Sequence, residues 1–439
     1  MISEGIMNGQ IKEVYTEILK EQLIPAMGCT EPVSVAYGAA RMRALLGDIP
    51  EEMYVQVSRN IIKNAKSVIV PHTGGLKGIE AAAAAGVIAG DETLELDVLS
   101  STRPQQYQEI AAYLKKDVIR VEPLSTDILF DMIITGVSEG HQARVRISGH
   151  HTFVTYLEKD GEILLDRRKE AEEEVISEEP VKEEKPALAV VDILEYVREV
   201  PLEEIRDVIE RQIGYNTAIA EEGLRGDYGA NIGKVLLKSS GPDPSIRIRA
   251  KAMAAAGSDA RMGGCEMPVI IVCGSGNQGI TASLPVVEYA KAYQISDEQL
   301  IRAVALSDLM AVHVKEGIGT LSAFCGAVCS GCSAGAGIAY LLGGDDKLIC
   351  HTFVNALAIV SGMICDGAKP SCAAKIAASV DAGILGYEMA VEGQEFYSGE
   401  GIVTKGIEGN IKNIGRLGRI GMKQTDEEIM NIMFNQSSC

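Results

Sequence analysis

The sequence predicts an α+β fold, made of a mainly α-helical body with an inserted α+β subdomain. Several short segments between residues 52 and 160 alternate apolar with polar residues, which is typical of half-buried strands. Residues 187–439 instead carry apolar residues at helical spacing, with glycine-rich loops between the predicted helices. We therefore expect a helical body formed by 1–51 plus 187–439, a subdomain at 52–160 and a charged linker at 161–186.

The first helices are predicted within residues 11–47, with a break at residues 24–28 where Pro25 and Gly28 lie. Thr30 suits the N-cap of the second helix. Pro32 falls in its first turn, where a missing N–H costs nothing.

The inserted subdomain is predicted to contain both strands and helices. Its expected strands are 54–58, 67–70, 94–98 and 118–121, followed by a hairpin of 142–148 with 152–157. Its expected helices are 80–89 and 105–115.

Composition excludes some classes of partner. The formal net charge of -20 argues against nucleic acid and anionic membranes, because both require a basic surface. Ten cysteines without a secretory signal indicate a reducing compartment, so we expect a soluble cytoplasmic protein. Separately, we expect it to be a homo-oligomer, as a dimer. Residues 317–344 carry no charge, but their small residues predict a buried central helix rather than a membrane span.

Cysteines gather late in the chain. Six of the ten lie between residues 317 and 401 in glycine- and alanine-rich surroundings, namely Cys325, Cys329, Cys332, Cys350, Cys365 and Cys372. Thiolates on small, backbone-rich turns are the usual ligands of iron–sulfur clusters. A helical core with buried thiols fits the same spacing, so both interpretations stay open.

Two other chemical interpretations fit less well. Gly274–Gly279 matches the dinucleotide-binding pattern G-x-G-x-x-G between a predicted strand (268–273) and a predicted helix (280–293). However, another helix (297–305) follows instead of a second strand, and Pro285 interrupts the helix 280–293. The loop still offers N–H groups that suit a carboxylate. The spacing C-x-x-x-C-x-x-C from Cys325 is that of radical enzymes, but it lies in a helical region rather than near the start of a barrel.

Longer motifs carry a family resemblance. The C-terminal body resembles the α domain of bacterial iron–sulfur L-serine dehydratases in three runs: GGCEMPV from Gly263, GNQGITASLP from Gly276 and CGAVCSGCSAGAGIA from Cys325. Nearly the whole chain is similar to the L-cysteine desulfidase family and its YhaM-like relatives, which share GCTEP at 28–32, residues 64–75 ending in PHTGG, and GMICDGAKPSC at 362–372. The resemblance implies a serine dehydratase α-domain-like body.

The resemblance also implies a cofactor. By that likeness Cys325, Cys365 and Cys372 are the ligands of a [4Fe–4S] cluster. Three thiolates leave one iron open, which can act as a Lewis acid on the carboxylate or leaving group of a substrate. Cys329 and Cys332 then lie beside the cluster, although spacing alone does not exclude either as a ligand.

The same likeness assigns a catalytic base. Cys29 corresponds to the proton acceptor of the desulfidases, and a thiol just before a helix start favours the thiolate. The alternative is a buried small residue at a helix start. Glu31 is the second candidate base.

Substrate-binding residues are expected at glycine-rich turns. His72 and Thr73 precede paired glycines, and Asn277 lies in the glycine loop, so these three are the substrate-binding candidates. Asp366 and Lys369 lie between two predicted ligands and are expected to hydrogen-bond around the cluster. The terminal Cys439 is a candidate cap for the open iron.

The expected function is cleavage of L-cysteine to sulfide, ammonia and pyruvate by an iron–sulfur lyase, with a small amino acid as its partner. L-Serine dehydration is the alternative within the class, and a non-catalytic cluster or thiol sensor is the alternative outside it. A pyridoxal phosphate enzyme would need a Schiff-base lysine in a phosphate-binding context, and the sequence shows no such arrangement.

Overall fold

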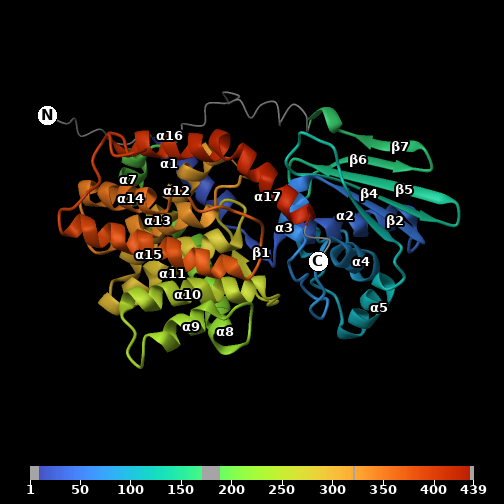
Figure 1. Ribbon diagram of the computed structural model, residues 1–439, viewed down its shortest axis with the longest axis horizontal. Coiled ribbons are helices and arrows are strands. Elements are labelled where there is room, and N and C mark those ends of the chain that lie inside the picture. Colours follow the sequence, from blue (N-terminus) through green and yellow to red (C-terminus); the bar gives the residue numbers. More distant parts are fainter. Residues whose placement is uncertain (1–8, 171–187, 320–321, 436–439) are drawn as a thin grey trace.

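Two hydrophobic cores lie side by side in the computed structural model, which describes residues 9–170, 188–319 and 322–435 (Figure 1). One core fills a helical body and the other lies between a sheet and its helices. The architecture is therefore a helix-rich α+β fold, as predicted. No helix in the described ranges is both long and apolar enough to cross a membrane.

The larger sheet has six strands in the order β3-β2-β4-β5-β6-β7. Only β2 and β3 pair in parallel, and each remaining pair is antiparallel. Its strands are β2 (Glu52–Val57), β3 (Ile119–Pro123), β4 (Asp131–Ser138), β5 (His141–Ser148), β6 (Val154–Lys159) and β7 (Glu162–Asp166).

Helices pack with this sheet around the second hydrophobic core. They are α2 (Thr30–Leu46), α3 (Arg59–Ala65), α4 (Ile79–Ala89) and α5 (Pro104–Leu114), with a short 3-10 turn η1 (Glu95–Asp97). The second core includes residues of α2, which contacts β4, β5 and α4. Gly86 allows the close approach of α4, because a Cβ there would lie 2.1 Å from the Ala36 carbonyl oxygen. The domain boundary expected at residue 51 differs from this packing, since α2 joins the sheet core.

The helical body is built around α13, which packs against α11, α12, α14 and α15. Residues Ala327 to Leu341 are all buried, in agreement with the predicted central helix. Glycines permit its contact with α15, because a Cβ on Gly383 would lie 2.2 Å from the Gly331 carbonyl oxygen. The helices of this body are α1 (Gly9–Gln22), α7 (Val190–Glu199), α8 (Leu202–Arg225), α9 (Ile232–Ser239), α10 (Ile246–Met262), α11 (Gly276–Tyr293), α12 (Asp297–Ile318), α13 (Gly326–Leu341), α14 (Asp346–Val360), α15 (Ser371–Val391) and α16 (Ile407–Arg416).

Several local predictions need correction. Residues 94–98 contain η1 and 67–70 form only an isolated bridge at Ile69, so neither is a strand. The strand β4 was not predicted, and β7 lies inside the expected linker, whose residues 171–187 fall outside the described ranges. Helix α11 runs through Pro285, because packing on every side maintains the helix where one N–H is missing.

The two bodies contact each other at several places, including the following two. Strands β1 (Pro25–Met27) and β8 (Pro268–Ile270) form a small antiparallel ladder, with Met27 opposite Pro268. After the π-helical turn η2 (Leu417–Gly421), helix α17 (Lys423–Asn435) returns to α3, where Lys63 pairs with Asp426 at 2.5 Å (Figure 1).

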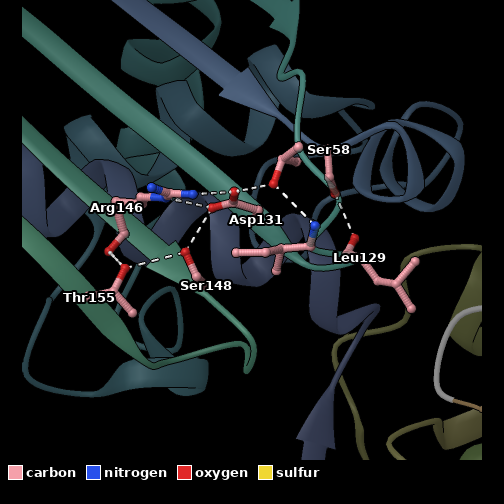
Figure 2. A network of polar contacts seen from close by, with 8 residues as sticks. Ser58, Leu129, Asp131, Arg146, Ser148 and Thr155 are labelled. Atoms are coloured by element: carbon pink, nitrogen blue, oxygen red, sulfur yellow. Dashed lines mark hydrogen bonds and ion pairs between the residues drawn. The ribbon is translucent and has the colours of Figure 1, made fainter. Parts of the chain in front are cut away.

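A buried polar network fixes the start of β4 in the sheet (Figure 2). Asp131 is fully buried and accepts two hydrogen bonds from the Arg146 guanidinium, at 2.9 and 2.7 Å. Ser148 and Thr126 also donate to its carboxylate. Its backbone carbonyl accepts from the N–H of Ser58, just before α3.

Candidate active site

A thiol and a carboxylate meet at the start of α2. Cys29 is the N-cap of this helix, and its Sγ donates to Glu31 Oε2 at 3.1 Å. Asn64 Nδ2 of α3 donates to the other carboxylate oxygen at 3.0 Å. Thr30 Oγ1 also lies within bonding distance of Glu31 Oε2. The carboxylate is therefore held from two helices.

The electrostatics of this pair correct one expectation. Burial and the Glu31 carboxylate raise the pKa of Cys29 well above its ordinary value, so the helix start does not favour the thiolate here. Burial alone would raise the pKa of Glu31, but His151, the Cys29 hydrogen bond and Arg261 together lower it. In the free protein the pair is thus a thiol beside a carboxylate.

The turn at residues 71–75 packs against the Cys29 segment. Gly28 has a φ of +68°, and a Cβ there would lie 2.4 Å from the Pro71 ring, so this approach requires glycine. His72 Nε2 lies 3.0 Å from Met27 Sδ, and its Nδ1 lies 3.3 Å from Glu266. The two sequence motifs that contain Cys29 and His72 are therefore neighbours in space.

Thr73 has a different local role in this turn. Its hydroxyl donates to the Val70 carbonyl at 2.7 Å and accepts from the N–H of Leu76. These bonds hold the turn that presents His72, and the side chain is buried.

Asn277 lies in the first turn of α11, beside the end of α10. Its Oδ1 is buried and has no hydrogen-bond partner. The preceding Gly276 touches Arg261, because a Cβ on Gly276 would lie 2.5 Å from Arg261 Nε. Charge interactions link Arg261 to both Cys29 and Glu31. Asn277 is therefore placed near the thiol–carboxylate pair through Gly276 and Arg261.

Three cysteines gather where two loops meet. Cys325 is the N-cap of α13, and Cys372 lies in the first turn of α15. Cys365 lies on the loop before α15, whose backbone pairs with the Cys325 segment: Cys325 N–H donates to Met363 and Cys365 N–H to Ala323. Backbone pairing thus brings together residues forty positions apart in the sequence.

The three thiols influence one another electrostatically. Burial, followed by the neighbouring Cys365 and Cys372, raises the pKa of Cys325 to about 12. Burial also raises the pKa of Cys372, with a contribution from Cys365. The three residues are therefore neighbours and not isolated among aliphatic side chains.

Two lysines provide positive charge beside these thiols. Asp366 pairs with Lys369 at 2.5 Å and also with Lys375. Burial alone would lower the pKa of Lys375, but Asp366 and the thiols Cys325 and Cys365 raise it. The ammonium group therefore partly offsets the effect of burial, which raises the pKa of Cys325 and Cys372.

An iron–sulfur cluster needs thiolate ligands that converge on one point. Among the described residues, no group of three His, Cys, Asp or Glu side chains is arranged to hold a metal ion. The donor type, the shared location and the adjacent lysine charge fit a thiolate-bound cluster, because each thiol comes from a loop or helix start. The three thiols are thus candidate ligands by their chemistry, and their arrangement is not that of a metal-bound site.

The loop before α15 that carries Cys365 and Gly367, here called the cysteine loop, contacts the pair Cys29–Glu31 through α3. Gly367 packs directly on this helix, since a Cβ there would lie 2.1 Å from the Lys63 carbonyl oxygen. The next residue of α3, Asn64, binds Glu31. Cys372 Sγ in turn lies 3.7 Å from the Gly367 carbonyl oxygen. Helix α3 therefore separates the cysteines from Cys29 by one layer of contacts.

The remaining cysteines occupy other positions. Cys329 and Cys332 are fully buried within α13, while Cys265, Cys273 and Cys350 pack against the helical core. Cys439 lies outside the described residues.

Sequence reasoning missed Arg261 and His151. Arg261 lies two residues before the run GGCEMPV, but its burial depends on the contact between α10 and α11. His151 lies in the turn between β5 and β6, and only the folded chain brings it to Glu31. Neither position carries a periodic signal, so only the neighbouring motif pointed toward Arg261.

Comparison with known proteins gives a consistent family. The serine dehydratase alpha chain family matches residues 93–431. A UPF0597 protein of Desulfitobacterium hafniense is 54% identical over 97% of both chains. UPF0597 proteins of Lachnoclostridium phytofermentans and Treponema denticola are 46% and 43% identical, over 95% and 96% of this chain and 99% and 97% of theirs. The family suggests a serine dehydratase-like lyase of amino-acid catabolism, and with its match over most of the length, this chain belongs to the serine dehydratase alpha chain family.

Proposed function

We propose that this protein cleaves L-cysteine to sulfide, ammonia and pyruvate by α,β-elimination. One observation carries the proposal: a buried thiol–carboxylate pair, Cys29 and Glu31, lies one helix away from the cysteine loop. The likeness of GCTEP and PHTGG to the desulfidases supports L-cysteine as the substrate, and these two motifs pack against each other.

The pair supplies the base for the first step. The Cα–H bond breaks as Cys29 sulfur accepts the proton, while the original thiol proton passes to Glu31 along the 3.1 Å hydrogen bond. The electron pair from Cα forms the Cα–Cβ double bond, and the Cβ–S bond breaks with its electrons on sulfur. The aminoacrylate product becomes an imine, which water hydrolyses to pyruvate and ammonia.

Cys325, Cys365 and Cys372 are the residues that would hold a [4Fe–4S] cluster. When bound, the cluster would supply a Lewis acid for the leaving group. Asp366 positions Lys369 and Lys375 beside the three thiols, which favours their thiolate forms.

L-Serine is the second candidate substrate, with water as the leaving group after protonation. The description of the matched family favours it. The pair Cys29–Glu31 abstracts the same Cα proton in either reaction, so the base does not distinguish them.

The test is anaerobic reconstitution with iron and sulfide, followed by assays of sulfide and pyruvate from both amino acids. We expect sulfide and pyruvate from L-cysteine, and a Cys29→Ala variant that retains the cluster absorbance but loses at least 100-fold in kcat. The half-buried Cys350→Ala serves as a matched cysteine control, with activity unchanged. A reconstituted protein that forms pyruvate from neither amino acid would overturn the proposal and favour sensing.

A further inference from the structure

Arg261 is a buried cation at the end of α10 that forms no direct ion pair with any described residue, although the Glu31 carboxylate acts on it from further away. Only 4% of the residue is exposed. Its Nε has no hydrogen-bond partner, and none of the ion pairs in the described ranges includes its guanidinium. Burying an arginine costs several kcal/mol unless it is paired, so this arrangement suits a protein that receives an anion here.

The surroundings of Arg261 define where such an anion lies. Arg261 Nε sits over the backbone of Gly276, the first residue of the 18-residue helix α11. A helix start presents N–H groups and the positive end of the helix dipole. An anion at this point therefore meets a guanidinium and a helix start together.

A complementary acceptor lies next to this cationic position. Asn277 follows Gly276, and its Oδ1 is buried without a hydrogen-bond partner. An amide oxygen accepts hydrogen bonds, so it suits an ammonium group. A cationic position beside a free acceptor matches the two ends of an amino-acid zwitterion.

We infer that Arg261 and the start of α11 bind the α-carboxylate of the amino-acid substrate, with Asn277 Oδ1 accepting from its ammonium group. The inference rests on the proposed function and adds a positioning residue to it. Arg261 interacts electrostatically with Cys29 and Glu31, so a carboxylate fixed there brings Cα toward the thiol. Without Arg261, the Glu31 carboxylate would repel the substrate carboxylate.

The experiment measures binding without turnover in the reconstituted full-length protein. L-Alanine is the probe, because it has the carboxylate, ammonium and Cα–H but no leaving group. L-Alaninamide is its partner probe, because it lacks the carboxylate charge. By calorimetry, we expect the wild-type protein to bind L-alanine roughly 10- to 100-fold more tightly than L-alaninamide.

Variants of Arg261 test whether this residue causes the preference for L-alanine over L-alaninamide. Arg261→Gln should lose the preference and bind L-alanine roughly 10- to 100-fold more weakly, and Arg261→Lys should recover part of it. For substrate turnover, Arg261→Gln should raise KM more than it lowers kcat. The matched control is Arg249→Gln on the same helix, whose guanidinium already bonds the Pro244 carbonyl, and its binding should stay unchanged.

The outcomes separate the two proposals. Equal affinity of the wild-type protein for both probes, or an unchanged preference in Arg261→Gln, would overturn the inference even if pyruvate forms. An Arg261-dependent preference without pyruvate from either substrate would leave the inference standing and overturn the proposed lyase. Absence of both binding and turnover would overturn both.

Discussion

At the scale of single residues, Cys29 and Glu31 share one hydrogen bond in which the thiol is the donor. Cys29 keeps its proton because it is buried beside a carboxylate whose own pKa is lowered. The family resemblance of the GCTEP motif made Cys29 the first candidate base and Glu31 the second. The direction of the Cys29 pKa shift could not be predicted, because burial and the position of Glu31 outweigh the helix dipole only in the folded chain.

Removing the charge of Glu31 should release the thiol proton more easily. In Glu31→Gln the carboxylate that raises the pKa of Cys29 is gone, so the thiolate fraction rises at a given pH and the alkylation of Cys29 by iodoacetamide accelerates. Peptide mass spectrometry at pH 8 gives the rate.

Glu266→Gln is the matched control for this measurement, because Glu266 contacts His72 rather than Cys29. Its alkylation rate should equal that of the wild-type protein. A rate in Glu31→Gln no faster than this control would contradict the described electrostatics.

At the scale of helices and strands, a buried acid makes the packing of α12 on α8 sensitive to pH. Burial raises the pKa of Asp308 to about 8, and Gln212 donates one hydrogen bond to it at 3.0 Å. The unfolded chain ionises this group near its ordinary value of 3.8. Between these values the unfolded state binds fewer protons, so this group costs stability increasingly as pH rises from about 4 to 8.

Asp308→Asn should remove this dependence. The amide keeps the hydrogen-bonding shape beside Gln212 but carries no titratable proton, so the variant gains stability relative to wild type as pH rises. Urea denaturation at pH 5 and pH 8 measures the difference. A stability difference that is the same at both pH values would contradict the assignment.

The sheet carries a second test, at Asp131. Asp131→Ala should lower the free energy of unfolding by about 3 kcal/mol, because Arg146 loses a buried carboxylate that it contacts twice. Asp117→Asn, at an exposed pair on the same body, should change it by less than about 0.5 kcal/mol. Equal effects of the two substitutions would refute the structural role of the network in Figure 2.

Helices and strands were predictable from the sequence where the spacing of apolar residues stayed regular over a long segment. The helices α4, α5 and α11 and the hairpin of β5 with β6 lie close to their predicted positions. The strand β4 was missed because buried strands lack alternation: its residues Met132, Ile134 and Thr135 are all buried. The association of α2 with the sheet depends on small-residue contacts such as Gly86 with Ala36, which no local pattern reveals.

At the scale of the whole molecule, the candidate site is divided between two cores. Cys29, Glu31 and Asn64 come from helices of the sheet core, while Arg261, Asn277 and the three cysteines come from the helical body. Sequence motifs had indicated Cys29, Asn277 and the three cysteines as candidates, but neither Arg261 nor Asn64. Their proximity could not be predicted, because it depends on how the two cores meet.

Adding one methyl group at Gly367 should disturb the contact between the two cores. Gly367 has a φ of +92° and no room for a Cβ against Lys63, so Gly367→Ala should push the cysteine loop away from α3. We expect less iron retained per chain after reconstitution and a lower kcat, with both cores still folded. Gly362→Ala is the control on the same loop, because nothing lies within 4 Å of its Cβ. Equal iron content in the two variants would contradict this expectation.

The ladder of β1 with β8 has a consequence for tolerance to insertions. Cys29 follows β1 by two residues, and Gly276 follows β8 after a short loop. The pairing of Met27 with Pro268 therefore fixes the distance between the proposed base and the proposed anion position. One extra residue between Met27 and Cys29 would displace the sulfur by about 3.3 Å while leaving every side chain present. Such a protein would keep every candidate site residue and still lack activity, because the distance between the base and the anion position would be wrong.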